Sequence, residues 1–524
     1  MNVFTEWPST STCYVLPRRV QPHSHIHLFY RPLTSSAANA QRPNSQLATI
    51  MSLSTLNEDV LRIIAEMLSS TECIPLSSVS RHLHAIARQY VFASITVGTM
   101  KQLVKMHDHL MRNIDNRRIW PRELTIYGLP GKVPYKAPAI DALVGIFEHA
   151  QELKALELHW CEAMIDCDAR IGEHLAALSN LSDIRLLAVG PKTLDVLCKM
   201  VSRPDKAYLS STMLFSNRAL LRIAEAAVLG NVKRLRLHNC QFDARSELQL
   251  LSKLAGVYPR LEVLDLEGSA VYPCLILFPN IRRLTIVGGL YNLPPPGYPV
   301  EQRHLDYLSI EPTYLHLISA GPAIRSDYLR LYTERQRFDP SEVGPDLVSA
   351  AAVLELNLFS VECPTEFGMA LAQMISAMVS RIRYLVLTTQ WYSYSAVTRW
   401  MENITPSLSP SQLFCIRVHA THAVDRGPSR ETWLELLQRL QSVHVSSVPS
   451  LRFYFQHVEC LDDQRKPSGP SKTTSWRVEG NGDHRTVQPI PNWQGERIHR
   501  YMQSPEFCRT LQFDEGAALQ YTGR

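Results

Sequence analysis

Pairs of leucine or isoleucine residues, separated by one residue, recur along the chain from about residue 120. In each copy apolar residues alternate with polar ones, as in LKALELHWC (153–161) and VKRLRLHNC (232–240). This two-residue period predicts β-strands with at least one buried face. Copies lie at 122–128, 153–161, 181–189, 232–240, 261–269, 281–289, 305–312, 326–334, 353–361, 382–390, 412–420 and 449–455, with a further candidate at 206–212.

Segments with the spacing of amphipathic helices separate several of these copies, which are mostly about twenty to thirty-odd residues apart. The alternation predicts an α/β solenoid with a parallel sheet over residues 121–460. Cys161 and Cys240 each follow the second leucine of a copy by three residues, where leucine-rich repeats favour Asn or Cys. The copies therefore resemble leucine-rich repeats, and both thiols are expected to be structural. The helix-like segments are 139–151, 192–202, 218–230, 247–257 and 367–381.

Residues 53–93 predict three short helices: 57–68, a second beginning at Pro75, and 81–93. Asn57 can cap the first helix, whose opening turn is acidic, as the helix dipole favours. Val60, Ile64 and Leu68 form an apolar stripe on it. Some forty residues make a marginal core, so the surplus apolar surface is expected to serve a partner.

This segment resembles an F-box. The family's Leu-Pro and acidic helix start correspond to Leu56-Asn57 and Glu58-Asp59, and Asn57 departs from the usual Pro. The further matching motifs are Val60-Leu61…Ile64…Leu68, Leu76-Ser77-Ser78-Val79-Ser80-Arg81 and Tyr90-Val91-Phe92.

The whole chain is similar to the F-box proteins with degenerate leucine-rich repeats that are numerous in fungi. The resemblance implies a non-catalytic substrate receptor of a Skp–cullin–F-box ubiquitin ligase, with no cofactor. Its partners would be a Skp-type adaptor, through it a cullin scaffold, and a target protein. The adaptor-facing residues carried over by motif are Leu56, Asp59, Val60, Ile64, Leu68, Leu76, Val79, Ser80 and Arg81.

Polar residues that alternate with the repeat leucines are expected on the exposed sheet face and are the candidate target-binding set. Tyr and Arg are enriched at binding hot spots. Alternatively, Arg234 and Arg236 merely pair with Asp265 and Glu267 of a neighbouring strand. A register error of one residue would reverse every assignment. The candidate residues are Arg234, Arg236, His238, Asp265, Glu267, Arg283, Tyr307, Tyr328, Arg330 and Tyr332.

Two other functions stay open. A repeat scaffold without ubiquitin-ligase association would use residues 53–93 only as a cap of the solenoid. An enzyme would need a catalytic motif, but the chain has no P-loop, G-x-S-x-G, H-E-x-x-H or complete dinucleotide fingerprint. His159, Cys161, Cys167 and His174 have no standard zinc spacing, so a structural role is favoured and no metal site is assigned.

The net charge of +5 over 524 residues gives no argument for nucleic acid. The chain has no apolar run long enough to span a membrane, and its 11 cysteines lack a C-x-x-C pair, which favours reduced thiols in cytoplasm or nucleus. Residues 1–50 are polar and expected to be disordered; alternatively, translation begins at Met51, or the segment is a mitochondrial transit peptide. The remaining expected divisions are an F-box at 51–98, a helical linker at 99–120, a polar loop or linker at 461–496, and a C-terminal tail or cap at 497–524.

Overall fold

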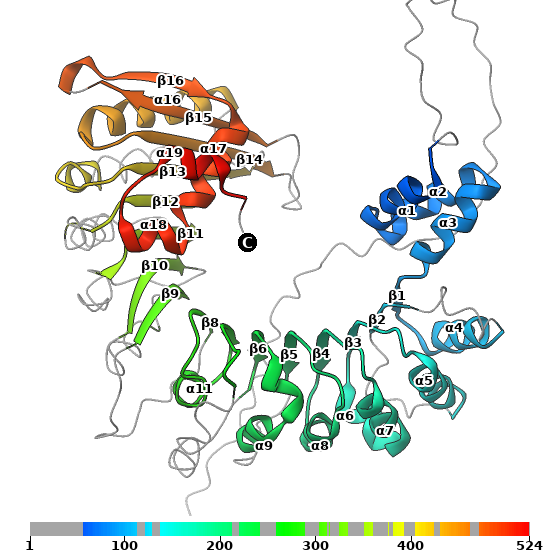
Figure 1. Cartoon of the computed structure of the whole chain (residues 1–524). Helices are drawn as coiled ribbons and strands as arrows, with labels where there is room; N and C mark the ends of the chain where they lie inside the picture. Colours follow the sequence, from blue (N-terminus) through cyan, green and yellow to red (C-terminus); the bar gives the residue numbers. More distant parts are fainter. Residues whose placement is uncertain are drawn as a thin grey trace, which may run out of the picture. The chain divides into compact units, whose positions relative to one another are not determined.

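The computed structural model (Figure 1) describes residues 56–112, 121–127, 137–211, 219–240, 258–288, 303–311, 314, 324–333, 350–359, 376, 381–391, 404–423, 430–461, 471–480 and 482–522. The chain divides into two compact units, Met1–Leu56 and Asn57–Arg524. The expectation of disorder over 1–50 and the predicted helix at 247–257 lie outside the described residues, and of the predicted helix at 367–381 only residues 376 and 381 are described.

Strands and helices alternate along the second unit. The strands are β1 (Ser94–Val97), β2 (Glu123–Ile126), β3 (Ala155–Leu158), β4 (Asp183–Leu187), β5 (Lys206–Ser210), β6 (Arg234–His238), β7 (Val263–Glu267), β8 (Arg283–Val287), β9 (Arg303–Ile310), β10 (Ile324–Thr333), β11 (Val353–Phe359), β12 (Tyr384–Trp391), β13 (Cys415–Ala423), β14 (Phe453–Leu461), β15 (Lys472–Glu479) and β16 (Thr486–Ile490). The principal helices are α1 (Glu58–Met67), α2 (Ser70–Val79), α3 (Arg81–Val91), α4 (Met100–Met111), α5 (Ala137–His149), α6 (Cys161–Cys167), α7 (Ala169–Ala177), α8 (Pro191–Lys199), α9 (Ala219–Glu225), α11 (Val271–Leu277), α16 (Arg430–Ser447), α17 (Asn492–Met502), α18 (Pro505–Thr510) and α19 (Glu515–Gln520).

The described strands form one open sheet in which every strand pairs with its neighbours in sequence, from β1 to β16. The pairs are parallel from β1 to β14 and antiparallel at β14–β15 and β15–β16. Every repeat copy identified in the sequence, including 206–212, forms a strand. The prediction of an α/β, solenoid-like fold with parallel strands is therefore confirmed.

The prediction of a polar loop or linker over 461–496 is wrong, because 472–479 and 486–490 form β15 and β16. Their Pro, Gly and Ser content indicated a loop. Val478, however, lies in the main core, and Trp476 packs 6.1 Å from the ring of Tyr454. These two apolar side chains hold the strand on the sheet.

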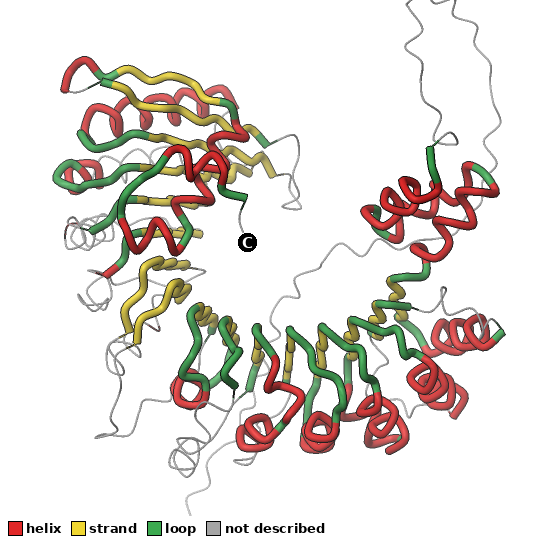
Figure 2. The backbone as a smooth tube through the Cα atoms, viewed as in Figure 1, coloured by secondary structure: helices red, strands yellow, loops and turns green. Residues whose placement is uncertain are grey.

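Leucines at alternate strand positions make the main core. Leu235 and Leu237 are 2% and 0% exposed, and the parallel register aligns Leu237 with its equivalents in the neighbouring strands. Helices α5, α7, α8, α9 and α11 lie along this face of the sheet (Figure 2). The predicted register is confirmed, so the alternate polar residues lie on the opposite face.

Several strands are followed by a residue whose backbone is in the left-handed region. In each of these repeats it lies two positions after the second buried residue of the strand. Gly268 and Gly288 have φ of 59° and 57°, while Trp160, Ala188 and Asn239 adopt the same region at a steric cost. This turn directs the next residue inward, so Cys161 and Cys240 are buried, as expected for structural thiols.

Candidate functional site

The helices α1–α3 are formed by local signals in the sequence. The side chain of Asn57 accepts a hydrogen bond from the backbone of Asp59, and Ser80 caps α3 in the same manner. Ser69 and Glu72 form a reciprocal capping box at the start of α2, and the Ser69 hydroxyl keeps the pKa of Glu72 below its usual value. The expectation that α2 begins at Pro75 is wrong, because this capping box sets the start at Ser70 and leaves the proline inside the helix.

Large apolar side chains are exposed on both α1 and α2. Val60, Ile63 and Met67 are 42%, 58% and 82% exposed and recur at i, i+3 and i+7 on one face of α1. Ile74 and Val79 of α2 are 46% and 63% exposed. These five side chains, the apolar patch below, are the majority of the large apolar side chains exposed in the described part of the chain. Exposed apolar side chains in such numbers are typical of a surface that binds another protein.

The carried-over adaptor residues fall into two groups. Asp59, Val60, Val79 and Arg81 are exposed, while the other five are only partly accessible; these are Leu56, Ile64, Leu68, Leu76 and Ser80. Leu61 and Ala65 form the buried stripe of α1. The outward face is therefore rotated from the predicted stripe toward Ile63 and Met67, which the motif comparison did not select.

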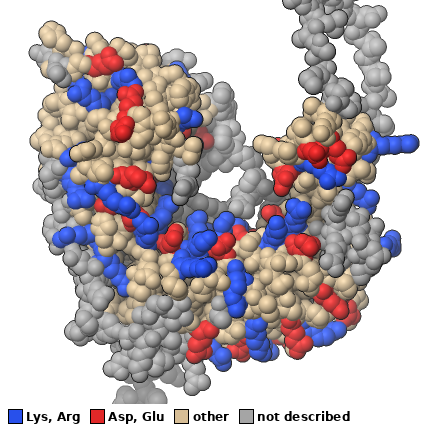
Figure 3. Space-filling view, in the orientation of Figure 1, with Lys and Arg blue, Asp and Glu red and all other residues tan. Residues whose placement is uncertain are grey.

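The second candidate surface is the sheet face opposite the repeat helices. Over β3–β8 it carries polar side chains at most alternate positions, such as Glu157, Arg185 and Tyr208. Glu157 accepts a hydrogen bond from His159 at 2.9 Å, which holds the pKa of this carboxyl below its usual range. Basic and acidic side chains are interspersed on the side of the molecule that Figure 3 shows. We call this polar region over β3–β9 the open face.

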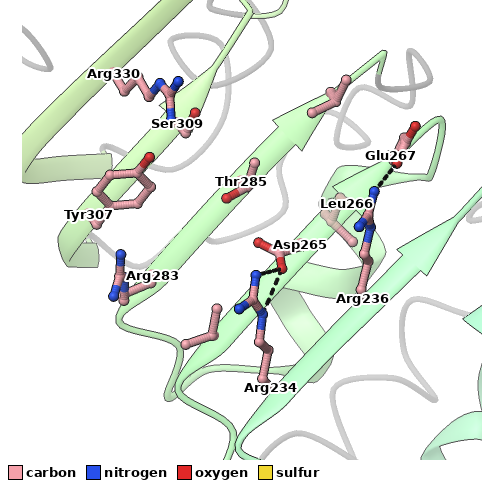
Figure 4. Close-up of a pocket in the computed structure, with 12 residues that line it drawn as sticks. Arg234, Arg236, Asp265, Leu266, Glu267, Arg283, Thr285, Tyr307, Ser309 and Arg330 are labelled. Atoms are coloured by element: carbon pink, nitrogen blue, oxygen red, sulfur yellow. Dashed lines mark hydrogen bonds and ion pairs between the residues drawn. The ribbon is translucent and has the colours of Figure 1, made fainter. Parts of the chain in front are cut away.

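Ion pairs between neighbouring strands cross the open face. Arg234 donates to Asp265 of β7 at 2.8 Å, and Arg236 donates to Glu267 at 2.6 Å (Figure 4). The expected pairing of these arginines with acids of the neighbouring strand is thus observed, and it does not exclude a binding role. Both guanidinium groups are half or more exposed, so each pair contributes at most about 1 kcal/mol. Pairs this weak can exchange partners with a bound ligand.

Nearby side chains complete the predicted set on β6 to β10. His238 lies 3.7 Å from Glu267, and burial lowers the pKa of its imidazole, which favours the neutral form. Arg283 lies over the ring of Tyr307, 4.9 Å from its centroid, and Arg330 lies 3.2 Å from Glu355 of β11. A hollow of about 380 Å³ is lined by these elements; its polar residues are Arg234, Arg236, Asp265, Glu267, Arg283, Thr285, Tyr307, Ser309 and Arg330.

The C-terminal helices cover the same sheet face further along the chain. Ile498 and Met502 of α17 and Phe507 of α18 form a second apolar core with residues of β10–β14. Tyr384 of β12 shares a hydrogen bond with His499, and Arg417 of β13 lies 3.3 Å from Glu496. The segment expected to be a tail or cap, 497–524, contains most of α17 together with α18 and α19, and these helices cover this face of the sheet.

This cover changes the interpretation of two predicted target-binding residues. Tyr328 and Tyr332 lie on the expected sheet face, but they are only 5% and 8% exposed. Tyr328 donates to Glu355 and accepts from Gln503 at 3.1 Å, and Tyr332 donates to the Ile286 carbonyl. The expectation that both tyrosines are exposed is wrong, because the C-terminal helices and the adjoining strands enclose this part of the sheet.

The cysteine–histidine alternative finds no support in the described residues, where no group of three or more His, Cys, Asp or Glu side chains could hold a metal ion. Burial raises the pKa of Cys161 and of Cys240 to about 12, so both are neutral thiols at physiological pH. Neither thiol is suited to act as a nucleophile.

Within the described part of the chain, every helix is too short or too polar to cross a bilayer. Comparison of the chain with protein-family models and with curated proteins finds no match in either.

Proposed function

We propose that this protein is a target-recognition subunit of a Skp–cullin–F-box ubiquitin ligase. In this proposal α1–α3 bind a Skp-type adaptor, and the open face binds the target protein. The apolar patch on α1 and α2 is the single observation that carries the proposal. The protein itself catalyses nothing, and it raises the local concentration of the target's lysines near a recruited conjugating enzyme.

The apolar patch is better explained by a partner than by folding. Leu61, Ala65 and Leu83 already supply the buried contacts of the three helices. Ile63 and Met67 add little to that core because they are mostly exposed. Burying both side chains against a partner would contribute roughly 2–4 kcal/mol of hydrophobic free energy. A helical adaptor with an apolar groove would recover this free energy, and the F-box resemblance supplies the class of adaptor.

Charged residues exposed on the same helices would favour an oriented contact. Asp59 and Arg81 are exposed, and Arg62 forms an ion pair with Glu58 at 2.6 Å on α1. Charged residues at the rim of an apolar contact direct encounter and register more than they add affinity. The same helices thus expose both apolar and charged side chains.

Binding of the full chain to a purified Skp-type adaptor tests the proposal. We expect the double substitution Ile63→Ser with Met67→Ser to weaken binding at least about 30-fold, because roughly 2 kcal/mol of burial is lost. Val201→Ser is the matched control, since Val201 is 60% exposed and lies outside α1–α3. Wild-type affinity in the double variant would refute the adaptor surface, and absence of binding by the wild-type chain would favour a repeat scaffold.

A further inference from the structure

The hollow on the open face contains one arginine without a carboxylate partner among the described residues. Arg234 and Arg236 are each paired with an acid of β7, and Arg330 lies beside Glu355. Arg283 has only the ring of Tyr307 beneath it, and it is exposed at the start of β8 (Figure 4). The hollow therefore has a positive charge that the described acids do not neutralise.

The position of Arg283 suits a planar anion. The aromatic ring under its guanidinium favours the charge and restricts the plane of the group. One edge of a guanidinium can donate two parallel hydrogen bonds to a carboxylate. Stacking on Tyr307 leaves the donors at the edge of the group available to such a ligand.

Two hydroxyl groups lie on the same part of the hollow. Thr285 and Ser309 are direct neighbours in the parallel register of β8 and β9. Both line the hollow, where Thr285 is partly exposed and Ser309 is 3% exposed. Adjacent strands are about 4.8 Å apart, so one anionic group can accept from both hydroxyls.

The charge balance favours a single negative charge. Asp265 is the register neighbour of Thr285, and its charge is compensated by Arg234. A carboxylate would match the uncompensated Arg283, whereas a dianion such as phosphate would leave an extra negative charge close to Asp265. Like charges at this distance destabilise one another.

We propose that the hollow binds the carboxylate of an aspartate or glutamate in a target peptide. Arg283 supplies the charge, Thr285 and Ser309 donate hydrogen bonds, and Tyr307 holds the guanidinium. The inference rests on the proposed role of the open face in target binding, and it names an acidic peptide segment as the class of target. It does not depend on the adaptor.

Selection of peptides from a random display library on the immobilised full chain tests the proposal. We expect an Asp or Glu to be enriched at one fixed position. Synthetic versions of a selected peptide, with that residue kept, changed to the matching amide, or changed to phosphoserine, are then compared by fluorescence anisotropy. The acidic peptide should bind about 10-fold or more tightly than the amide and more tightly than the phosphoserine form.

Substitutions in the chain assign the binding to the hollow. Arg283→Gln should reduce affinity for the acidic peptide about 10-fold or more, and Thr285→Val should reduce it by a smaller factor. Lys206→Gln is the matched control, because Lys206 is an exposed cation on the same face of β5 and does not line the hollow. Equal affinity for Arg283→Gln and wild type, no acidic enrichment, or preference for phosphoserine would each overturn the proposal.

These experiments distinguish a failure of the acidic-peptide proposal from a failure of the adaptor proposal. Adaptor binding is measured on the same Arg283→Gln chain, and we expect it to be unchanged. An acidic peptide that binds a chain unable to bind the adaptor would support the hollow and refute the ligase role alone. Adaptor binding without an acidic peptide would do the reverse.

Discussion

His444 of α16 makes the stability of the C-terminal part depend on pH in a predictable way. The side chain is fully buried, packs 5.7 Å from the ring of Tyr454, and neither ring nitrogen has a hydrogen-bond partner among the described residues. Burial lowers the pKa of His444 to about 4, against about 6.5 for an exposed histidine. The folded state therefore holds the imidazole neutral, whereas the unfolded state protonates it as the pH falls below about 6.5.

The magnitude follows from this difference between the two states. The contribution of His444 is fully present above about pH 6.5 and is lost as the pH falls toward about 4. With these two pKa values, the loss between pH 7 and pH 5 is about 2 kcal/mol, at a slope approaching 1.4 kcal/mol per pH unit. His444→Phe removes the titrating group and keeps a ring in the same position, so it should abolish this component.

Hydrogen exchange of peptides from α16 measures the local opening free energy of both chains, corrected for the intrinsic pH dependence of exchange. The opening free energy of the wild type should fall by about 2 kcal/mol more than that of His444→Phe between pH 7 and pH 5. His484→Gln is the control, because His484 is exposed. An identical pH dependence in His444→Phe and wild type would refute a buried neutral imidazole.

Two further perturbations test the sheet face. Phe507→Ala should destabilise the contact between α18 and the sheet by about 3–5 kcal/mol, because Phe507 is only 1% exposed. Amide hydrogen exchange in α18 and β10 should therefore become faster. Unchanged amide protection in these elements would contradict a packed cap. A double-mutant cycle of Arg234→Ala and Asp265→Ala should give a coupling below about 1 kcal/mol that decreases with salt. A salt-independent coupling above about 2 kcal/mol would indicate a fixed structural pair.

The sheet could be predicted from the sequence because one face is buried at every repeat. In a strand such as RLRLH (234–238), the alternation of Leu235 and Leu237 with charged residues indicates which side chains face the core. Strand β1 and the antiparallel strands β15 and β16 lack this signal. Their place depends on neighbours distant in the sequence, such as Tyr454 against Trp476.

The sequence also indicates where the exposed part of this sheet face ends. Strands β12 and β14, with YLVL (384–387) and FYF (453–455), are apolar at both alternate positions, which indicates burial on both faces. This pattern predicts that another segment covers Tyr384 and Phe455, but it does not identify that segment. The covering helix α17 is polar overall, and its few apolar residues, such as Ile498 and Met502, reveal a partner only in three dimensions.

The outward face of α1 was harder to predict from the sequence. Apolar residues lie on more than one side of this helix, so the pattern alone does not distinguish Leu61 and Ala65, which are buried, from Ile63 and Met67, which are exposed. The choice is set by α3, which packs against α1 and supplies Leu83 and Ile86 to the buried side. Tertiary packing therefore defines the apolar patch.

Hydrogen exchange of the full chain with and without a purified Skp-type adaptor tests the central claim most directly. At saturating adaptor, exchange should slow in peptides covering α1 and α2 (58–79) and stay unchanged on the open face over β6–β8. Unchanged exchange in α1 and α2 at saturating adaptor, or slowing only on the open face, would contradict the assignment of these helices as the adaptor-binding element.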